Sequence, residues 1–263
     1  MNPALALMVT GAACWHAWRE LAARINGPAD LLPLLLVLAA LCVPLMTRAP
    51  RLRPVRLLPL SVLSALYSIA VIMAPPIFCI APAALLICYC LYAASQDGLP
   101  RSSFLGLVLL ALPILPTLEF YTAYPVRLAA IEATATLLRM NGLAVGVEGL
   151  ALRFDASLIQ FDAPCSGVRM LWTCWFLTSA LAHLYRFAWW RYALALMLAT
   201  LFAVAGNILR ATSLFYLEAD LLHFSQFPGL HEAIGLAAFV MTAVLLFAAL
   251  RPRTQNLRPV VAA

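Results

Sequence analysis

The 263-residue chain contains no lysine, and all 17 of its basic residues are arginine. Charged residues of both signs make up only 11% of the chain, whereas hydrophobic residues make up 65% and the mean hydropathy is +0.95. An ordinary globular domain is about half apolar. This shortage of charge excludes an ordinary soluble domain, and we expect an integral membrane protein whose first partner is the lipid bilayer.

The formal net charge of +6 does not indicate a nucleic-acid-binding protein. A nucleic-acid-binding surface gathers its basic residues on one soluble face. Here the arginines lie mostly in short loops between apolar runs, which is typical of topology signals in membrane proteins. We therefore expect no nucleic-acid partner.

The seven cysteines include no CxxC pair and no cysteine–histidine cluster. This spacing predicts no metal site, and nothing else in the sequence calls for a cofactor. Six of the seven lie inside apolar segments, where a free cysteine usually acts as a small buried hydrophobe. The first apolar run has no basic region and cleavage site typical of a signal peptide, so we expect it to be a retained span.

Eight apolar runs are long enough to be membrane helices, since about 20 helical residues cross the hydrocarbon core. The predicted spans are residues 3–23, 31–47, 57–74, 76–95, 103–122, 165–185, 190–217 and 230–250. The predicted fold class is an all-α polytopic bundle of about eight transmembrane helices. Three regions are expected: a five-helix membrane region at 1–122, an external segment at 123–164 and a three-helix region at 165–263 with a short cytoplasmic tail.

The loop charges predict the orientation of this bundle. Arginines gather in the loops before the third and fifth spans, between the sixth and seventh, and after the eighth, while most acidic residues fall on the other side. The positive-inside rule makes the arginine-rich side cytoplasmic. Both termini are then cytoplasmic, and the segment 123–164 is external. Its first part has apolar residues at helical spacing, which predicts an interfacial helix. Its second part predicts a small β-hairpin or two short strands before the sixth span.

Only Arg169 and Arg210 fall well inside predicted spans, where an arginine near the bilayer centre costs about 2.5–3.5 kcal/mol. Arg210 lies about 10 Å from the outer end of its span, and Asn207, three residues earlier, shares its helix face. A purely structural interpretation, in which Arg210 extends toward the interface or bridges helices, stays open.

Two further residues are expected at the depth of Arg210. Cys165 opens the sixth span within DAPCSGVRML, where the positive end of a helix favours a thiolate, and His231 opens the eighth span within GLHEAIGLAAF. The N–H groups of the turn at Ser166 and Gly167 could receive an oxyanion. Cysteine supplies a nucleophile, histidine a proton shuttle and arginine a fixed positive charge. A buried inert thiol is the alternative for Cys165.

The motifs PCSGVR, GNILR and LHEAIGLAAF, at Cys165, Arg210 and His231, resemble those of the exosortase and archaeosortase membrane transpeptidases. The resemblance extends over about residues 125–250, and a histidine at the third position resembles the bacterial branch. It implies that Cys165 is the nucleophile and that Arg210 and His231 complete the catalytic site. Asn207, Ser166, Gly167 and Arg169 are candidate supporting or substrate-binding residues.

The resemblance also implies a substrate and a location. Exported proteins with a C-terminal signal made of a motif with a Pro-Glu-Pro type core, a membrane helix and a basic tail would be cleaved through a thioester. The site would lie at the periplasmic face of the bacterial inner membrane, and an envelope polysaccharide or lipid is a candidate acceptor. Arg169 could stabilise the thiolate or bind an acidic residue of the motif, but it could equally pair with Asp162 or Glu232.

Two other classes of function are compatible with the sequence. A transporter or flippase could use Arg169 and Arg210 to bind an anionic substrate, but this gives Cys165 no role. A structural subunit of a polysaccharide-export assembly would tolerate changes at Cys165, Arg210 and His231 individually. Replacement of Cys165 distinguishes both from a cysteine transpeptidase.

Overall fold

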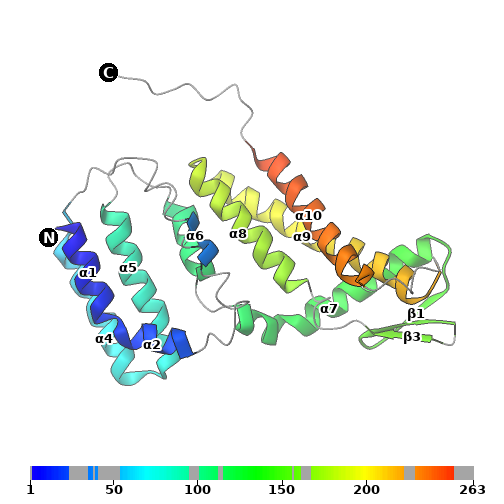
Figure 1. The fold of residues 1–263 in the computed structure, drawn as a ribbon, viewed down its shortest axis with the longest axis horizontal. Coiled ribbons are helices and arrows are strands. Elements are labelled where there is room, and N and C mark those ends of the chain that lie inside the picture. The colour runs from blue at the N-terminus through cyan, green and yellow to red at the C-terminus, as the bar shows by residue number, and fades with distance from the viewer. Residues whose placement is uncertain are drawn as a thin grey trace, which may run out of the picture. The chain divides into compact units, whose positions relative to one another are not determined.

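The computed structural model describes residues 2–23, 35–37, 39–40, 54–94, 101–111, 115–155, 157–160, 167–221 and 229–251. It is mostly helical, with one small three-stranded sheet, and it divides into two compact units. The first unit holds residues 1–114 and 182–192, and the second holds residues 115–181 and 193–263. Figure 1 labels the helices and strands of both units.

The first unit is built from short apolar helices. These are α1 (Pro3–Ala13), α2 (Trp15–Ala23), α4 (Leu57–Met73), the 3₁₀ helix η1 (Pro76–Cys79), α5 (Ile80–Ala94) and α6 (Arg101–Ala111). Its core packs Ala6 of α1 and Cys14, the residue between α1 and α2, against Leu60 and Tyr67 of α4 and Ala83 of α5. Small side chains at these contacts let helices approach closely, as membrane bundles require.

The second unit begins with α7 (Leu115–Met140), a single helix of 26 residues. The expected change from a span to an interfacial helix at residue 123 falls inside this continuous helix, and Pro125 is accommodated within it. The helix is closed by Gly142, two residues after its last residue, whose φ of 85° lets the N–H of Leu143 bond back to the carbonyl of Leu138 at 3.1 Å. This left-handed glycine cap directs the chain into the sheet.

The sheet confirms the prediction of short strands in this segment and adds a third one. Strands β1 (Val145–Glu148), β2 (Ala151–Phe154) and β3 (Ser157–Gln160) form an antiparallel meander in the order β1-β2-β3. Val147 pairs with Leu152, which pairs in turn with Ile159. Left-handed backbone at Gly149 and Asp155 makes the two tight turns.

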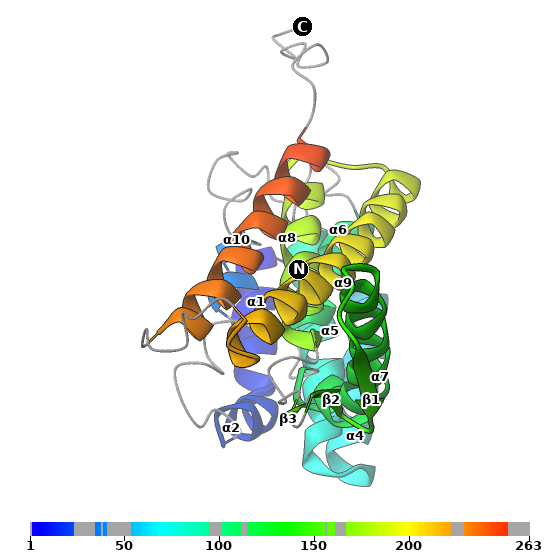
Figure 2. The ribbon, with the colours of Figure 1, turned by 90° about the vertical axis from the view of Figure 1, so that its right-hand side faces the viewer.

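Three long helices complete the second unit: α8 (Val168–Leu184), α9 (Trp189–Glu218) and α10 (Leu230–Leu250). Figures 1 and 2 show the parts of these helices that belong to this unit lying side by side, with α7 and the sheet at the end where α9 stops. A core of buried residues joins α7, all three strands and the last turns of α9. We call this end of the unit the sheet end.

Among the described residues, α9 and α10 are long and apolar enough to cross a membrane, and Leu57–Met73 and Ile80–Tyr92 are shorter apolar helices. The predicted count of eight spans is therefore not confirmed. The first predicted span is interrupted at Cys14, the fifth is divided between α6 and α7, and most of the second lies outside the described residues. An apolar run specifies a buried or lipid-facing segment, but it does not specify one uninterrupted helix.

Candidate active site

Gly167 caps the N-terminus of α8 and touches α9. Its φ of 76° is a left-handed conformation, and its carbonyl accepts the hydrogen bond from the N–H of Leu171 at 2.9 Å. A Cβ atom at this position would lie 2.8 Å from both Cγ and Nδ2 of Asn207. Both the backbone conformation and the close contact require glycine here.

Asn207 and Arg210 lie three residues apart on α9, so they are neighbours on its surface. Asn207 is only 4% exposed, and both its Oδ1 and the Nε of Arg210 are shielded from solvent. The side chain of Arg210 runs across Gly235 of α10, where a Cβ atom would lie 3.2 Å from Nε and 3.6 Å from Cζ. The missing side chain at residue 235 thus makes room for the arginine.

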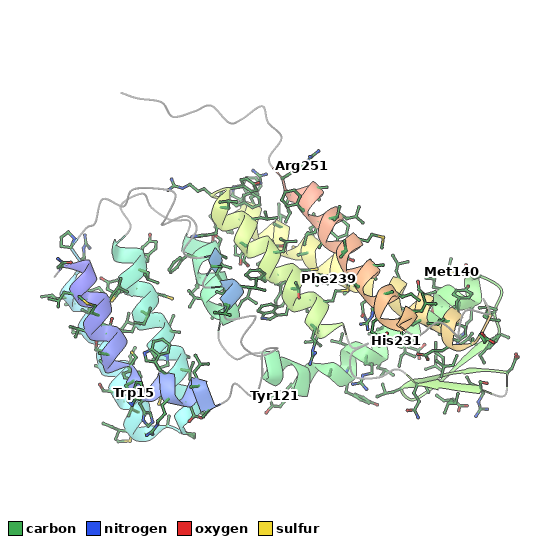
Figure 3. The ribbon with its side chains drawn as sticks, viewed as in Figure 1. Trp15, Tyr121, Met140, His231, Phe239 and Arg251 are labelled. Atoms are coloured by element: carbon green, nitrogen blue, oxygen red, sulfur yellow. The ribbon has the colours of Figure 1, made fainter. Side chains whose placement is uncertain are left out.

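His231 lies one helical turn before Gly235 on α10, so it shares the helix face that receives Arg210. Figure 3 shows His231 at the start of α10, at the sheet end of the unit. Its Nδ1 atom lies 3.6 Å from Oε1 of Glu218, the last residue of α9. His231 therefore lies beside the carboxylate of Glu218, and Arg210, also from α9, packs against α10 one turn farther along.

A tight contact farther from the sheet end sets the spacing of α8, α9 and α10. A Cβ atom on Gly206 of α9 would overlap Oγ1 of Thr242 and lie 2.7 Å from Cε of Met170, so α8, α9 and α10 converge on this glycine. Going toward the sheet end, α9 then meets α10 at Arg210 with Gly235 and at Glu218 with His231. These three contacts share one antiparallel register of α9 against α10. The packing of the two helices therefore determines where the site residues lie.

The sheet end holds the last turns of α9 in place. Leu214 and Phe215 of α9 are buried against Ile131 of α7, Leu152 of β2 and Ile159 of β3. Hydrogen bonds add to this packing: Asn141 Nδ2 donates to the Tyr216 hydroxyl at 3.1 Å, and Arg139 Nε donates to the Val145 carbonyl at 2.9 Å. The end of α7 and the sheet therefore support the helix that carries Asn207 and Arg210.

The structure brings together four of the residues predicted for the site: Gly167, Asn207, Arg210 and His231. Cys165 and Ser166 lie outside the described residues, just before Gly167. Arg169 is exposed in the first turn of α8, and its carbonyl accepts a hydrogen bond from Thr173 Oγ1 at 2.9 Å. Its role, whether toward a thiolate or a substrate, stays a prediction.

Glu218 was not among the residues predicted for the site. One signal in the sequence could have identified it: a carboxylate in the last turn of a helix faces the negative end of the helix dipole, which is unfavourable. A carboxylate at this unfavourable helix end indicates a compensating partner nearby.

Among the described residues, no group of three or more histidine, cysteine or acidic side chains could hold a metal ion.

Comparison with known proteins assigns the chain to a family. A family model described as transmembrane exosortase matches residues 2–248, nearly the whole chain. Neither the curated proteins nor the solved structures include a significant match.

Proposed function

Because the chain belongs to the transmembrane exosortase family, we propose that it is a cysteine transpeptidase or protease that cleaves C-terminal sorting signals of exported proteins. Cys165 would be the nucleophile, Arg210 the group that stabilises the oxyanion and His231 the general acid and base. Gly167, Ser166, Asn207 and Arg169 would support the site or bind substrate. The family and the long apolar helices make the chain a membrane protein, and the assignment of these roles is our inference.

The observation that carries the proposal is the meeting of three separate motifs on α9. The end of the CSG motif, Gly167, packs on Asn207, and Arg210 packs on Gly235 of the HEAIG motif. Asn207 and Arg210 are themselves neighbours on one helix. Cys165 is two residues before Gly167, so their Cα atoms can be no more than about 7 Å apart. A shared location of this kind supports a common reaction centre.

The residue types support an acyl transfer in two steps, formation of a thioester and its transfer to an acceptor. His231 takes the thiol proton of Cys165, the sulfur attacks the scissile carbonyl carbon, and the C–N bond breaks as His231 returns the proton to the departing amine. This leaves a thioester on Cys165. An acceptor amine or water then attacks the thioester, His231 takes its proton, and the C–S bond breaks to release the thiolate.

The charge that develops on the carbonyl oxygen needs stabilisation during both steps. The guanidinium of Arg210 is permanently charged, and the backbone N–H groups of the turn at Ser166 and Gly167 are the candidate further donors. Fixed donors of this kind act on the transition state without reorganising, and loss of one typically costs about 10²–10³ in rate. Packing against Gly235 and near Asn207 would hold the guanidinium in place for this purpose.

A membrane site suits a substrate with a tripartite tail of motif, membrane helix and basic stretch. The tail helix would pack in the bilayer beside this protein, so that the motif reaches the sheet end near Cys165. We propose that this end faces the periplasm from the bacterial inner membrane, with both termini cytoplasmic. A motif with a Pro-Glu-Pro type core would give Arg169 an acidic partner, and an envelope polysaccharide or lipid is the candidate acceptor.

The test follows an exported reporter with such a tail, coexpressed with the full chain. Wild-type protein should process the reporter and form a hydroxylamine-sensitive adduct with it, whereas Cys165→Ala should abolish both and leave the reporter uncut. Cys174→Ala is the matched control, since Cys174 is a buried free cysteine of α8. Continued processing by the Cys165→Ala protein would exclude the proposal and favour a transporter or a structural subunit.

A further inference from the structure

Glu218 and His231 lie together where α9 ends and α10 begins. Oε1 of Glu218 is 3.6 Å from Nδ1 of His231, and both side chains are partly exposed, at 38% and 43%. Glu218 is the last residue of α9, and His231 is the second residue of α10. The proposed function above assigns no role to this carboxylate.

Each of the two residues occupies the helix end that is unfavourable for its charge. A carboxylate is disfavoured at a helix C-terminus, and a protonated histidine is disfavoured at a helix N-terminus. Placed next to each other, the two side chains compensate for this, because the carboxylate offsets the positive end of α10 at the imidazole. The interaction between the two side chains therefore accounts for their positions at these helix ends, which the helix dipoles alone do not favour.

The backbone of Glu218 is held in place from both sides. Before it, Leu214 and Phe215 are buried in the core with α7 and the sheet. After it, Asp220 takes a φ of 51°, the N–H of Asp220 bonds to the Leu217 carbonyl at 3.1 Å, and the N–H of Leu221 bonds to the Tyr216 carbonyl at 3.2 Å. This left-handed termination ends α9 directly after the glutamate.

The contact also distinguishes the two nitrogens of the imidazole. Because Nδ1 faces Glu218, Nε2 lies on the far edge of the ring, away from the carboxylate. A carboxylate beside Nδ1 favours the tautomer with the proton on Nδ1, which leaves Nε2 to exchange protons with the reactants. The separation exceeds a hydrogen bond by a few tenths of an ångström, and such contacts often shorten when substrate binds.

We propose that Glu218 is a positioning residue that orients His231 and keeps Nε2 available for proton transfer. The inference rests on the proposed function, because it needs His231 to act as the general acid and base. Glu218 would not touch the substrate, so its removal should slow proton transfer and leave substrate binding unchanged.

The experiment compares Glu218→Gln with wild type in the full chain, reconstituted in liposomes and given two synthetic peptides with the same tail. One peptide has the natural scissile amide, and the other has a thioester at that bond. An amine needs a proton to depart, whereas a thiolate leaves without one. Glu218→Gln should lower the single-turnover rate on the amide about 10- to 100-fold, with unchanged half-saturation. It should lower the thioester rate by a clearly smaller factor, because only removal of the thiol proton of Cys165 then needs His231.

Two controls separate this role from a structural one. Glu232→Gln removes the same charge from the residue next to His231, which points to a different side of the helix, and it should retain the wild-type rate on both peptides. Adding Glu218→Gln to His231→Ala should cause no further loss, because a residue that acts only through the histidine has nothing left to orient.

The outcomes are distinct. Equal loss on the amide and the thioester, a further loss in the His231→Ala background, or a wild-type rate for Glu218→Gln on the amide would each overturn the inference. The proposed function fails separately, if Cys165→Ala still cleaves the thioester peptide or if His231→Ala cleaves the amide at the wild-type rate.

Discussion

Gly167 packs so closely against Asn207 that a Cβ atom at residue 167 would lie 2.8 Å from Cγ and Nδ2 of the asparagine. This contact joins the segment that follows Cys165 to the helix that carries Arg210. It depends on the absence of a side chain and on a positive φ, and both conditions can be tested by mutation.

Gly167→Ala should therefore impair the site strongly. The left-handed backbone costs a non-glycine residue about 1–2 kcal/mol, and the added methyl group must also displace Asn207. Since a displacement of about 1 Å can cost 10²-fold in rate, we expect reporter cleavage to fall about 100-fold. Gly146→Ala in β1 is the control, because its Cβ would lie an ordinary 3.8 Å from Cβ of Arg153. Equal activity of the two variants would show that the contact with Asn207 is dispensable.

Gly235→Ala should separate activity from stability. Residue 235 lies inside α10, where alanine is favoured over glycine by up to about 1 kcal/mol, so the melting temperature should not fall. The new Cβ would lie 3.2 Å from Nε of Arg210 and would shift the guanidinium by a few tenths of an ångström. We expect about tenfold slower cleavage. Gly11→Ala in α1, where no atom lies within 4 Å, should leave cleavage unchanged.

Gly206→Ala should disturb the contact among α8, α9 and α10. Its Cβ would overlap Oγ1 of Thr242, and overpacking of this kind costs about 1–3 kcal/mol. Thermal unfolding in detergent should show the loss. The double variant Gly206→Ala, Thr242→Ala removes the overlapping hydroxyl and should regain much of the stability. Without such recovery, the destabilisation of the single variant would have another origin.

Leu152→Ala should weaken the attachment of the sheet to α7 and α9. Leu152 is fully buried in the core at the sheet end, and removing such a side chain costs about 2–5 kcal/mol. Limited proteolysis within residues 143–160 should accelerate, and cleavage of the reporter should fall with it. Leu158→Ala in the neighbouring strand is the control, since Leu158 is 53% exposed. If Leu152→Ala is as resistant as Leu158→Ala, the sheet does not depend on this core.

Several features of the fold follow directly from local sequence. The strands of residues 145–160 are separated by Gly149 and Asp155, which adopt the left-handed conformations that tight turns require. Gly142 also adopts a left-handed conformation, and this terminates α7. By contrast, the continuity of α7 through Pro125 was not predicted, because the change in polarity near residue 123 resembles a boundary between elements.

The sequence by itself determined that this is a membrane protein, because its apolar content and scarce charge exclude a soluble fold, and it indicated the family through the order of the CSG, NILR and HEAIG motifs. Only the tertiary structure decided which residues of those motifs meet. The contacts of Gly167 with Asn207, of Arg210 with Gly235 and of Glu218 with His231 depend on the register of α9 against α8 and α10. That register is decided by close packing at glycines such as Gly206, which no local pattern reveals, because it depends on side chains distant in the sequence.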